Sequence, residues 1–176
     1  MRNFHFTALR SIKDMAQRGI LKRFGFTALV ATIVARLSPW LNSPCHLTGP
    51  DGEERDRQWL GRYGEDVATA WLRAHQCKIL ARNYRNERRG RRTGEVDIIA
   101  REDRLLLFVE VKTRHESSKI RPLDAVDKAK QELIERGAND WLRRLGTRQL
   151  PWRFDVIEIY VAEGKLPRVN RVRDAF

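Results

Sequence analysis

The chain has 176 residues, of which 41% are hydrophobic and 33% charged, so it can form one domain with a core plus an extension but is short for two full domains. These proportions exclude an intrinsically disordered chain and one embedded in a membrane, and are typical of a soluble globular protein. Lysine and arginine number 35 against 23 acidic residues, a formal net charge of +12. Such a charge favours a polyanionic partner, either nucleic acid or an anionic membrane surface, over a basic surface that binds nothing.

The composition divides the chain into an accessory segment, residues 1–55, whose role is unknown, and a domain at residues 56–176. Residues 24–35 are apolar and follow two basic residues, as in a signal peptide, but no small-residue cleavage site follows them. The run is also shorter than the roughly 20 residues of a transmembrane helix. An amphipathic helix, a peripheral anchor and an upstream choice of start codon stay open, and prolines and glycines at 44–52 mark a linker.

The two cysteines, Cys45 and Cys77, are not spaced as a disulfide framework or a structural zinc site. Reduced thiols are the simplest interpretation. We therefore expect a cytoplasmic protein without integral membrane insertion.

Regular patterning begins near Gly61. Apolar spacing predicts a helix over residues 62–76, and a short strand follows at 78–84. Residues 95–100 and 105–112 alternate as two strands of a hairpin, with polar turn residues between them.

A second helix is predicted to begin near Pro122 and to run to about Leu145, with Gly146 as its stop signal. It leads to a strand at residues 153–161, which implies a parallel crossover. The predicted order is α-β-β-β-α-β. The expected fold is therefore an α/β domain with a mixed four-stranded sheet flanked by helices.

Alternation along the hairpin brings acidic residues together. If the turn centres on residues 103–104, Asp97 lies opposite Glu110, and Glu95 opposite Lys112. Directly opposed side chains have Cβ atoms within about 5.5 Å of each other. Two carboxylates held that close repel each other unless a cation lies between them.

A divalent cation with oxygen ligands, Mg²⁺ or Mn²⁺, would meet that need. Asp97 and Glu110 would bind it, with the backbone carbonyl of Val111 nearby, and it would polarise a phosphodiester and lower the pKa of a bound water. Lys112 would orient that water or stabilise charge on the phosphate. Glu65, at the start of the first helix, is the natural third carboxylate. The alternative for a Glu-x-Lys pair alone is a solvated surface ion pair.

Arginines are concentrated just before the first hairpin strand, in a segment that we interpret as a mobile, exposed loop at the mouth of the site. Phosphate contacts from this loop would provide affinity but no sequence recognition, and Arg114 would extend the phosphate track. A solvated basic loop is the alternative. The arginines of the segment are Arg82, Arg85, Arg88, Arg89, Arg91 and Arg92.

The segments GRYGEDVATAWL, NYR, GEVDIIA, LLFVEVKTR, DKAKQ, RFDVIEI and the terminal DAF follow one another in the order and spacing of a known family. From residue 61 to 176 the chain resembles the YraN-like family of small bacterial proteins. That family looks like a branch of the restriction-endonuclease-like fold, related to archaeal Holliday-junction resolvases. The resemblance implies an active site of Glu65, Asp97, Glu110 and Lys112, with Gln131 and Lys130 near it on the second helix.

Three functions follow from these observations. The leading hypothesis is a Mg²⁺-dependent nuclease acting on structured nucleic acid, DNA rather than RNA, with a homodimer expected by analogy with resolvases that cut two strands. The second is a non-catalytic nucleic-acid-binding module on the same scaffold. The third is an adaptor that binds a membrane surface through a basic N-terminal helix.

Overall fold

The computed structural model describes residues 33, 38–88, 90–118, 127–146 and 150–176. The apolar run at 24–35, apart from Ile33, and the basic N-terminal helix of the membrane hypothesis lie outside these residues. No helix within the described ranges is long and apolar enough to cross a lipid bilayer.

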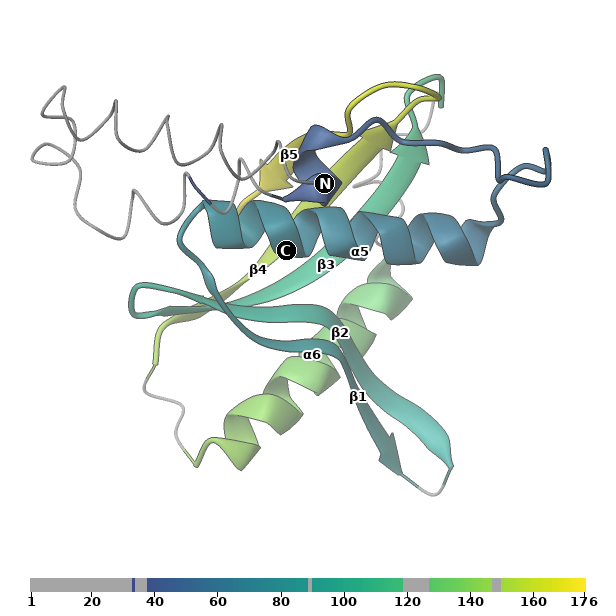
Figure 1. The fold of residues 1–176 in the computed structure, drawn as a ribbon. Helices are drawn as coiled ribbons and strands as arrows, with labels where there is room; N and C mark the ends of the chain where they lie inside the picture. Colours follow the sequence, from purple (N-terminus) through teal and green to yellow (C-terminus); the bar gives the residue numbers. More distant parts are fainter. Residues whose placement is uncertain (1–32, 34–37, 89, 119–126, 147–149) are drawn as a thin grey trace, which may run out of the picture.

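The structure has one mixed sheet with the strand order β1-β2-β3-β4-β5, in which only β3 and β4 are parallel, and α6 connects them (Figure 1). This confirms the α/β class with helices flanking a mixed sheet. The predicted order of elements is present from α5 to β4, and a fifth strand extends the four-stranded sheet that the sequence predicted. The elements are α4 (Pro39–Asn42), α5 (Arg57–Ala74), β1 (Lys78–Arg88), β2 (Arg91–Glu102), β3 (Leu105–His115), α6 (Lys128–Arg144), β4 (Trp152–Val161) and β5 (Arg168–Val172).

Both long helices begin at an aspartate that caps them. The carboxylate of Asp56 accepts a hydrogen bond of 2.6 Å from the backbone of Trp59, and that of Asp127 one of 2.8 Å from Lys130. Such caps satisfy backbone donors that lack a partner within the helix. Consequently α5 begins earlier than predicted and α6 later, at Lys128 rather than near Pro122, which lies outside the described residues.

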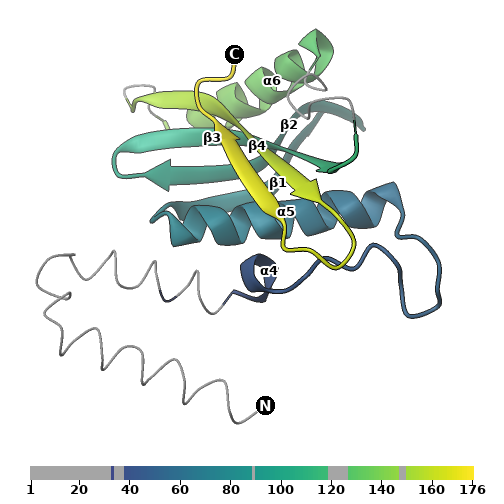
Figure 2. The same cartoon turned by 90° about the horizontal axis from the view of Figure 1, so that it is seen from above.

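The sheet lies between the two helices, with α5 on one face and α6 on the other (Figure 2). Leu107 and Val109 of β3 join the core beneath α5, whereas Leu106 and Phe108 join the core beneath α6. The predicted alternation of β3 is therefore confirmed. It continues to Glu110, which points to the α6 side of the sheet because it follows Phe108 by two residues.

Glycines allow each helix to approach the sheet at backbone distance. A Cβ atom at Gly64 of α5 would lie 1.8 Å from the hydroxyl of Thr113 on β3. A Cβ at Gly94 of β2 would lie 2.5 Å from the backbone nitrogen of Gly137 on α6, and one at Gly137 would lie 2.9 Å from that of Glu95. These contacts set the position of α6 against the strand that carries Glu95 and Asp97.

Beyond Asp97, β1 and β2 leave the sheet as a two-stranded ribbon (Figure 1). The register of β2 with β3 ends at Ile98 and Val109, whereas β1 and β2 stay paired as far as Arg88 and Arg91. We call residues 84–88 and 91–96 the β1–β2 ribbon. The prediction that the arginine-rich segment is a loop is wrong for these residues, because they extend the two strands of a hairpin.

The segment before α5 packs on the domain. Cys45 is fully buried in the core beneath α5, its N–H donates to the carbonyl of Lys165 at 2.8 Å, and its own carbonyl accepts from the N–H of Gly164 at 2.9 Å. Cys45 and Cys77 are both buried free thiols. The division of the chain between residues 55 and 56 stays a prediction.

Candidate functional site

Asp97 and Glu110 meet where the β1–β2 ribbon leaves the sheet. The β2–β3 register, continued by one residue beyond Ile98 and Val109, leads to these two acids. The carboxylate of Asp97 accepts a hydrogen bond of 2.8 Å from the backbone N–H of Val111 through Oδ2. The side chain of Asp97 therefore accepts a hydrogen bond from the β3 backbone at the point where the backbones of β2 and β3 are no longer paired.

The environment of Asp97 opposes its ionisation. Burial and then the neighbouring charge of Glu110 raise the pKa of Asp97 to about 7, although Lys130 and the N–H of Val111 act in the opposite direction. At pH 7 the Asp97 carboxyl is therefore about half protonated, and a cation bound beside it would favour its ionised form. Such a pair is a common feature of functional sites.

Glu110 is the most buried acid of the site, with 2% of its side chain exposed. Its Oε1 atom accepts from the ammonium groups of Lys112 at 2.8 Å and of Lys130 at 3.2 Å. Its Oε2 atom is buried without a hydrogen-bond partner in the described structure. A buried carboxylate oxygen in that state is costly, and a bound cation would satisfy it.

Lys130 connects the site to α6. Its ammonium group lies 2.7 Å from Oε1 of Glu95 as well as near Glu110. Burial alone would lower the pKa of Lys130, but Glu110, Asp97 and Glu95 outweigh it and raise that pKa. Glu95 also lies 3.5 Å from Arg85. The predicted pairing of Glu95 with Lys112 is not part of the observed register, and α6 supplies the partner of Glu95 instead.

Glu65 approaches from α5. Its Oε2 atom accepts a hydrogen bond of 2.7 Å from the side-chain amide of Asn83. Burial raises the pKa of Glu65, Asn83 lowers it, and the charge of Asp97 raises it again. Glu65 is thus electrostatically coupled to Asp97. Among the described residues, however, no group of three or more His, Cys, Asp or Glu side chains is gathered as a metal site.

The residues at the ribbon base nevertheless fit a hard divalent cation. Asp97 and Glu110 offer two carboxylates, and the backbone of Val111 runs between them and offers a carbonyl. Mg²⁺ commonly takes one or two carboxylates and keeps several waters. The unsatisfied Oε2 atom of Glu110 is the observation in favour of this fit.

Comparisons with known proteins identify the family. The model of the uncharacterised protein family UPF0102 matches residues 64–159, which span most of α5 to β4 and include every candidate catalytic residue. The chain belongs to this family. The match confirms the resemblance to the YraN-like family, and the residues before Gly64 lie outside the part that the family model covers.

Individual UPF0102 proteins are similar over the same share of the chain. One from Rhodococcus jostii (strain RHA1) is 43% identical over 117 residues, which are 66% of this chain and 95% of the relative. One from Geobacter sulfurreducens is 42% identical over 117 residues, 66% of this chain and 88% of the relative. One from Anaeromyxobacter dehalogenans is 37% identical over 128 residues, 73% of this chain and 91% of the relative.

Within the UPF0102 region, the structure places the other predicted residues less centrally. Gln131 is half-buried in the first turn of α6, beside Lys130. Arg114 donates to the carbonyl of Thr113 at 3.2 Å. Arg85, Arg88, Arg91 and Arg92 lie on the β1–β2 ribbon, and Arg89 lies outside the described residues.

Two polar residues that sequence reasoning did not single out belong to the surroundings of the site. Asn83 has a φ of 50° within β1, a left-handed conformation that asparagine tolerates better than most residues, and its amide donates to Glu65. Glu158 is fully buried next to Lys112 in the β3–β4 register and accepts a hydrogen bond of 2.6 Å from Asn170. The sequence signal that could have identified Glu158 is its place as a single acid between two isoleucines of a predicted strand.

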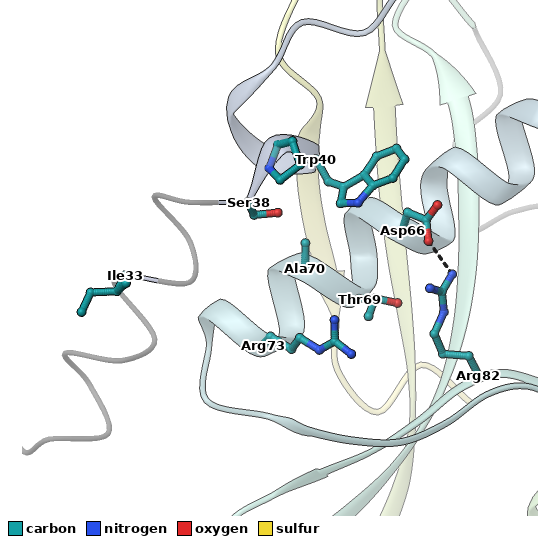
Figure 3. A pocket seen from close by; sticks show the side chains of 9 residues that line it. Ile33, Ser38, Trp40, Asp66, Thr69, Ala70, Arg73 and Arg82 are labelled. Carbon is teal, nitrogen blue, oxygen red and sulfur yellow. Dashed lines mark ion pairs between the residues drawn. The ribbon is translucent and has the colours of Figure 1, made fainter. Parts of the chain in front are cut away.

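A pocket of about 360 Å³ lies beside α5, and residues of α4, α5 and β1 line it (Figure 3). Trp40, which precedes α5, and the ion pair between Asp66 and Arg82 at 2.7 Å belong to its lining. Arg82 also lies 3.9 Å from Glu65. The sequence placed Arg82 among the phosphate-binding residues, but Asp66 neutralises much of its charge.

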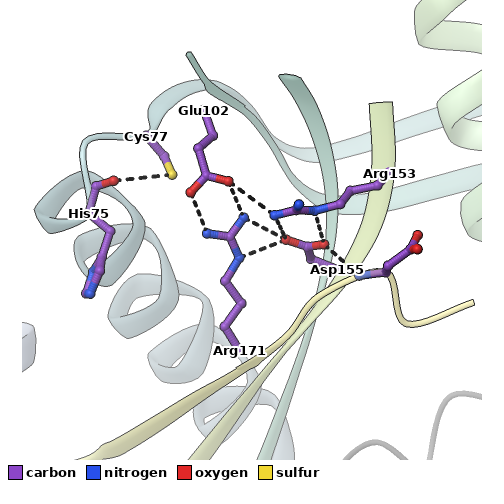
Figure 4. Close-up of polar contacts among 7 residues, drawn as sticks. His75, Cys77, Glu102, Arg153, Asp155 and Arg171 are labelled. Atoms are coloured by element: carbon purple, nitrogen blue, oxygen red, sulfur yellow. Dashed lines mark hydrogen bonds and ion pairs between the residues drawn. The ribbon is translucent and has the colours of Figure 1, made fainter. Parts of the chain in front are cut away.

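A second polar cluster lies away from the candidate site and joins three strands (Figure 4). Asp155 of β4 is fully buried and accepts hydrogen bonds from Arg153 at 2.7 Å and Arg171 at 2.8 Å. Arg171 of β5 also donates two bonds of 2.9 Å to Glu102 at the end of β2. Asp155 therefore stabilises two arginines from neighbouring positions of the sheet.

Proposed function

We propose that the protein is a Mg²⁺- or Mn²⁺-dependent nuclease that acts on structured DNA. The observation that carries this proposal is the pair of acids at the ribbon base, in which the buried Glu110 has an unsatisfied oxygen and the pKa of Asp97 is raised to about 7. A structural ion pair has no need of a second carboxylate in that position. A cation site does.

Each residue of the site has a role in this proposal. Asp97, Glu110 and the carbonyl of Val111 would hold the ion, which when bound supplies a Lewis acid for the phosphate and lowers the pKa of a bound water. Lys112 keeps an ammonium beside Glu110, where it stabilises charge developing on a phosphate oxygen. Glu65, held by Asn83, is the third acid. Gln131 contributes a polar side chain from α6.

The net charge of +12 supports a polyanionic partner for the same site. The arginines on the β1–β2 ribbon and Arg114 are the proposed phosphate contacts. A homodimer in the cytoplasm would allow two sites to cut two strands.

The second candidate is a nucleic-acid-binding module without cleavage. One observation favours it: the hydrogen bond from Val111 and the two lysines at Glu110 already give both acids protein partners. In that case these side chains would stabilise the ribbon base only.

The experiment that decides between the two compares cleavage of labelled branched, flapped, duplex and single-stranded DNA with Mg²⁺ or Mn²⁺. Asp97→Asn and Glu110→Gln are expected to abolish cutting, with losses of at least about 100-fold. Asp66→Asn is the matched control, since Asp66 lies next to Glu65 on α5 but pairs with Arg82.

Binding of Mn²⁺ by calorimetry gives a readout independent of cleavage. The wild type and Asp66→Asn are expected to bind the ion, and Asp97→Asn to bind it far more weakly. Tight binding of DNA by a wild type that neither cuts DNA nor binds Mn²⁺ would refute the enzymatic proposal and leave the binding module.

A further inference from the structure

Among the described residues, no strand pairs with the β1–β2 ribbon on its β3 side. Val96 pairs with Tyr84 and the pairing continues to the turn, while the register of β2 with β3 has already ended at Ile98. From residue 96 to residue 91 the ribbon extends about 17 Å, at about 3.3 Å per residue. Isolated two-stranded hairpins are only marginally stable in water, so the ribbon needs an anchor.

Helix α6 anchors the base of the ribbon and leaves the rest uncovered. Gly137 meets Gly94 at backbone distance, Arg136 donates to the carbonyl of Thr93 at 2.8 Å, and the hydroxyl of Tyr84 donates to Asp140. On β2, these contacts involve Thr93 and Gly94 and do not extend beyond Thr93 toward the turn. The base of the ribbon is therefore fixed, and its distal part projects from the domain (Figure 1).

The distal part of the ribbon is rich in arginine. Residues 85–92 contain five arginines and one glutamate. Glu87 lies opposite Arg92 and Glu95 opposite Arg85, but Arg88 lies directly opposite Arg91. The excess of positive charge in this stretch would attract a polyanion to the ribbon.

We propose that the β1–β2 ribbon enters the major groove of duplex DNA and makes the protein prefer duplex DNA over duplex RNA. The inference rests on the proposed function for the identity of the partner as nucleic acid. The major groove of B-form DNA is about 12 Å wide and admits a two-stranded β-ribbon, whereas the minor groove, about 6 Å wide, does not. The major groove of duplex RNA is deep and narrow and excludes such an element.

The position of the ribbon links this binding mode to the candidate site. Asp97 is the residue at which the ribbon begins, and Glu110 lies beside it. A duplex that holds the ribbon in its groove therefore has its phosphate backbone next to the two acids. In this proposal the ribbon selects the type of duplex, and the two acids serve its cleavage.

The test measures binding of the full chain, without divalent metal, to a short DNA duplex, an RNA duplex of the same sequence and the single strands. The variant is Arg88→Gln with Arg91→Gln. The control, Arg101→Gln with Arg104→Gln, removes the same charge from exposed positions at the other end of the β2–β3 hairpin. We expect the ribbon variant to bind the DNA duplex about 10-fold more weakly, with a salt slope lower by about 2, and the control to stay near wild type.

Methylation of guanine N7, an atom exposed in the major groove, adds a positional readout. Wild type and control are expected to protect N7 from dimethyl sulfate, and the ribbon variant to lose this protection. Equal affinity for DNA and RNA duplexes, absence of N7 protection by wild type, or an equal loss in the control would each overturn the inference. If metal-dependent cleavage is nevertheless observed in any of these cases, the proposed nuclease function is retained and only the binding mode of the ribbon is refuted. A wild type that binds no nucleic acid would overturn both.

Discussion

At the scale of single residues, Asp97 links the fold to the candidate chemistry. Its carboxylate takes the N–H of Val111 where the backbone of β2 no longer reaches β3, and it shares a buried space with Glu110. A polar group that only closed a gap in the ladder would not need a charge. The raised pKa therefore means that folding places an acid where its ionised form is disfavoured.

Replacing Asp97 with Asn is expected to stabilise the fold at high pH. The pKa of Asp97 is raised from its ordinary value of 3.8 to about 7. Ionisation of Asp97 therefore lowers the free energy of unfolding progressively between these two pH values, and the full loss is reached above pH 7. The shift corresponds to at most about 4 kcal/mol. The amide oxygen of Asn can still accept from Val111.

Urea unfolding of both proteins at several pH values tests this expectation. Asp97→Asn should exceed wild type in free energy of unfolding above pH 7, and the difference should vanish toward the ordinary pKa of 3.8. Asp66→Asn serves as the control, because Asp66 pairs with Arg82 at 2.7 Å and is not part of the Asp97–Glu110 pair. A variant less stable than wild type at every pH would mean that the carboxylate supports the fold.

How far the sequence could predict the site follows from the range of each interaction. Alternation along two adjacent strands was enough to bring Asp97 to Glu110, since the turn lies only a few residues away. The meeting of Lys130 with Glu95 depends on the path of α6 over the sheet. The left-handed turn of Asn83 toward Glu65 depends on the position of α5. Neither is encoded in local periodicity.

At the scale of elements, the position of α6 is set by one close contact. Gly137 touches the backbone of β2 beside Gly94, and Lys130 lies two helical turns before it on α6. A shift of α6 away from the sheet would therefore withdraw the ammonium group from Glu95 and Glu110.

Gly137→Ala is expected to destabilise the protein, whereas Gly61→Ala is expected to stabilise it. A Cβ at Gly137 would lie 2.9 Å from the backbone nitrogen of Glu95, whereas a Cβ at Gly61 meets nothing within 4 Å. Overpacking costs about 1–3 kcal/mol, and alanine in place of an exposed helical glycine gains up to about 1 kcal/mol. Thermal and urea unfolding measure both, and similar effects of the two substitutions would contradict this account of the α6 position.

The elements that sequence patterns missed or misjudged are those held by distant partners. The β1–β2 ribbon is rich in arginine and contains a glycine, a composition of loops, but pairing across the hairpin and α6 at its base make it a strand pair. The five residues of β5, Arg168–Val172, are too short and too charged for a strong strand signal. Arg171 and Asn170 attach them to acids of β2 and β4.

At the scale of the whole molecule, the cluster of Glu102, Arg153, Asp155 and Arg171 joins the ends of β2, β4 and β5. The hydrogen bond from Arg171 is the main cause that lowers the pKa of Glu102. A carboxylate with a lowered pKa stabilises the fold above its unfolded pKa, and this contribution is lost as the pH falls through the folded value.

Glu102→Gln is therefore expected to be less stable than wild type at neutral pH, by about 1–3 kcal/mol, because Arg171 loses a charged partner. The difference should narrow as the pH falls below the ordinary glutamate value of 4.5. Glu116→Gln is the control: its partner Lys165 is 67% exposed, and exposed pairs contribute less than about 1 kcal/mol. A difference between wild type and Glu102→Gln that does not change with pH would contradict this role of the Glu102 charge.

The burial of Cys45 has a consequence for the order in which the chain is made. Cys45 leaves the ribosome long before the backbone that pairs with it, at Gly164 and Lys165. The thiol therefore remains accessible to a maleimide reagent until the turn between β4 and β5 has left the ribosome, and it is then buried. Modification of Cys45 on nascent chains of increasing length would report the moment at which the domain is complete.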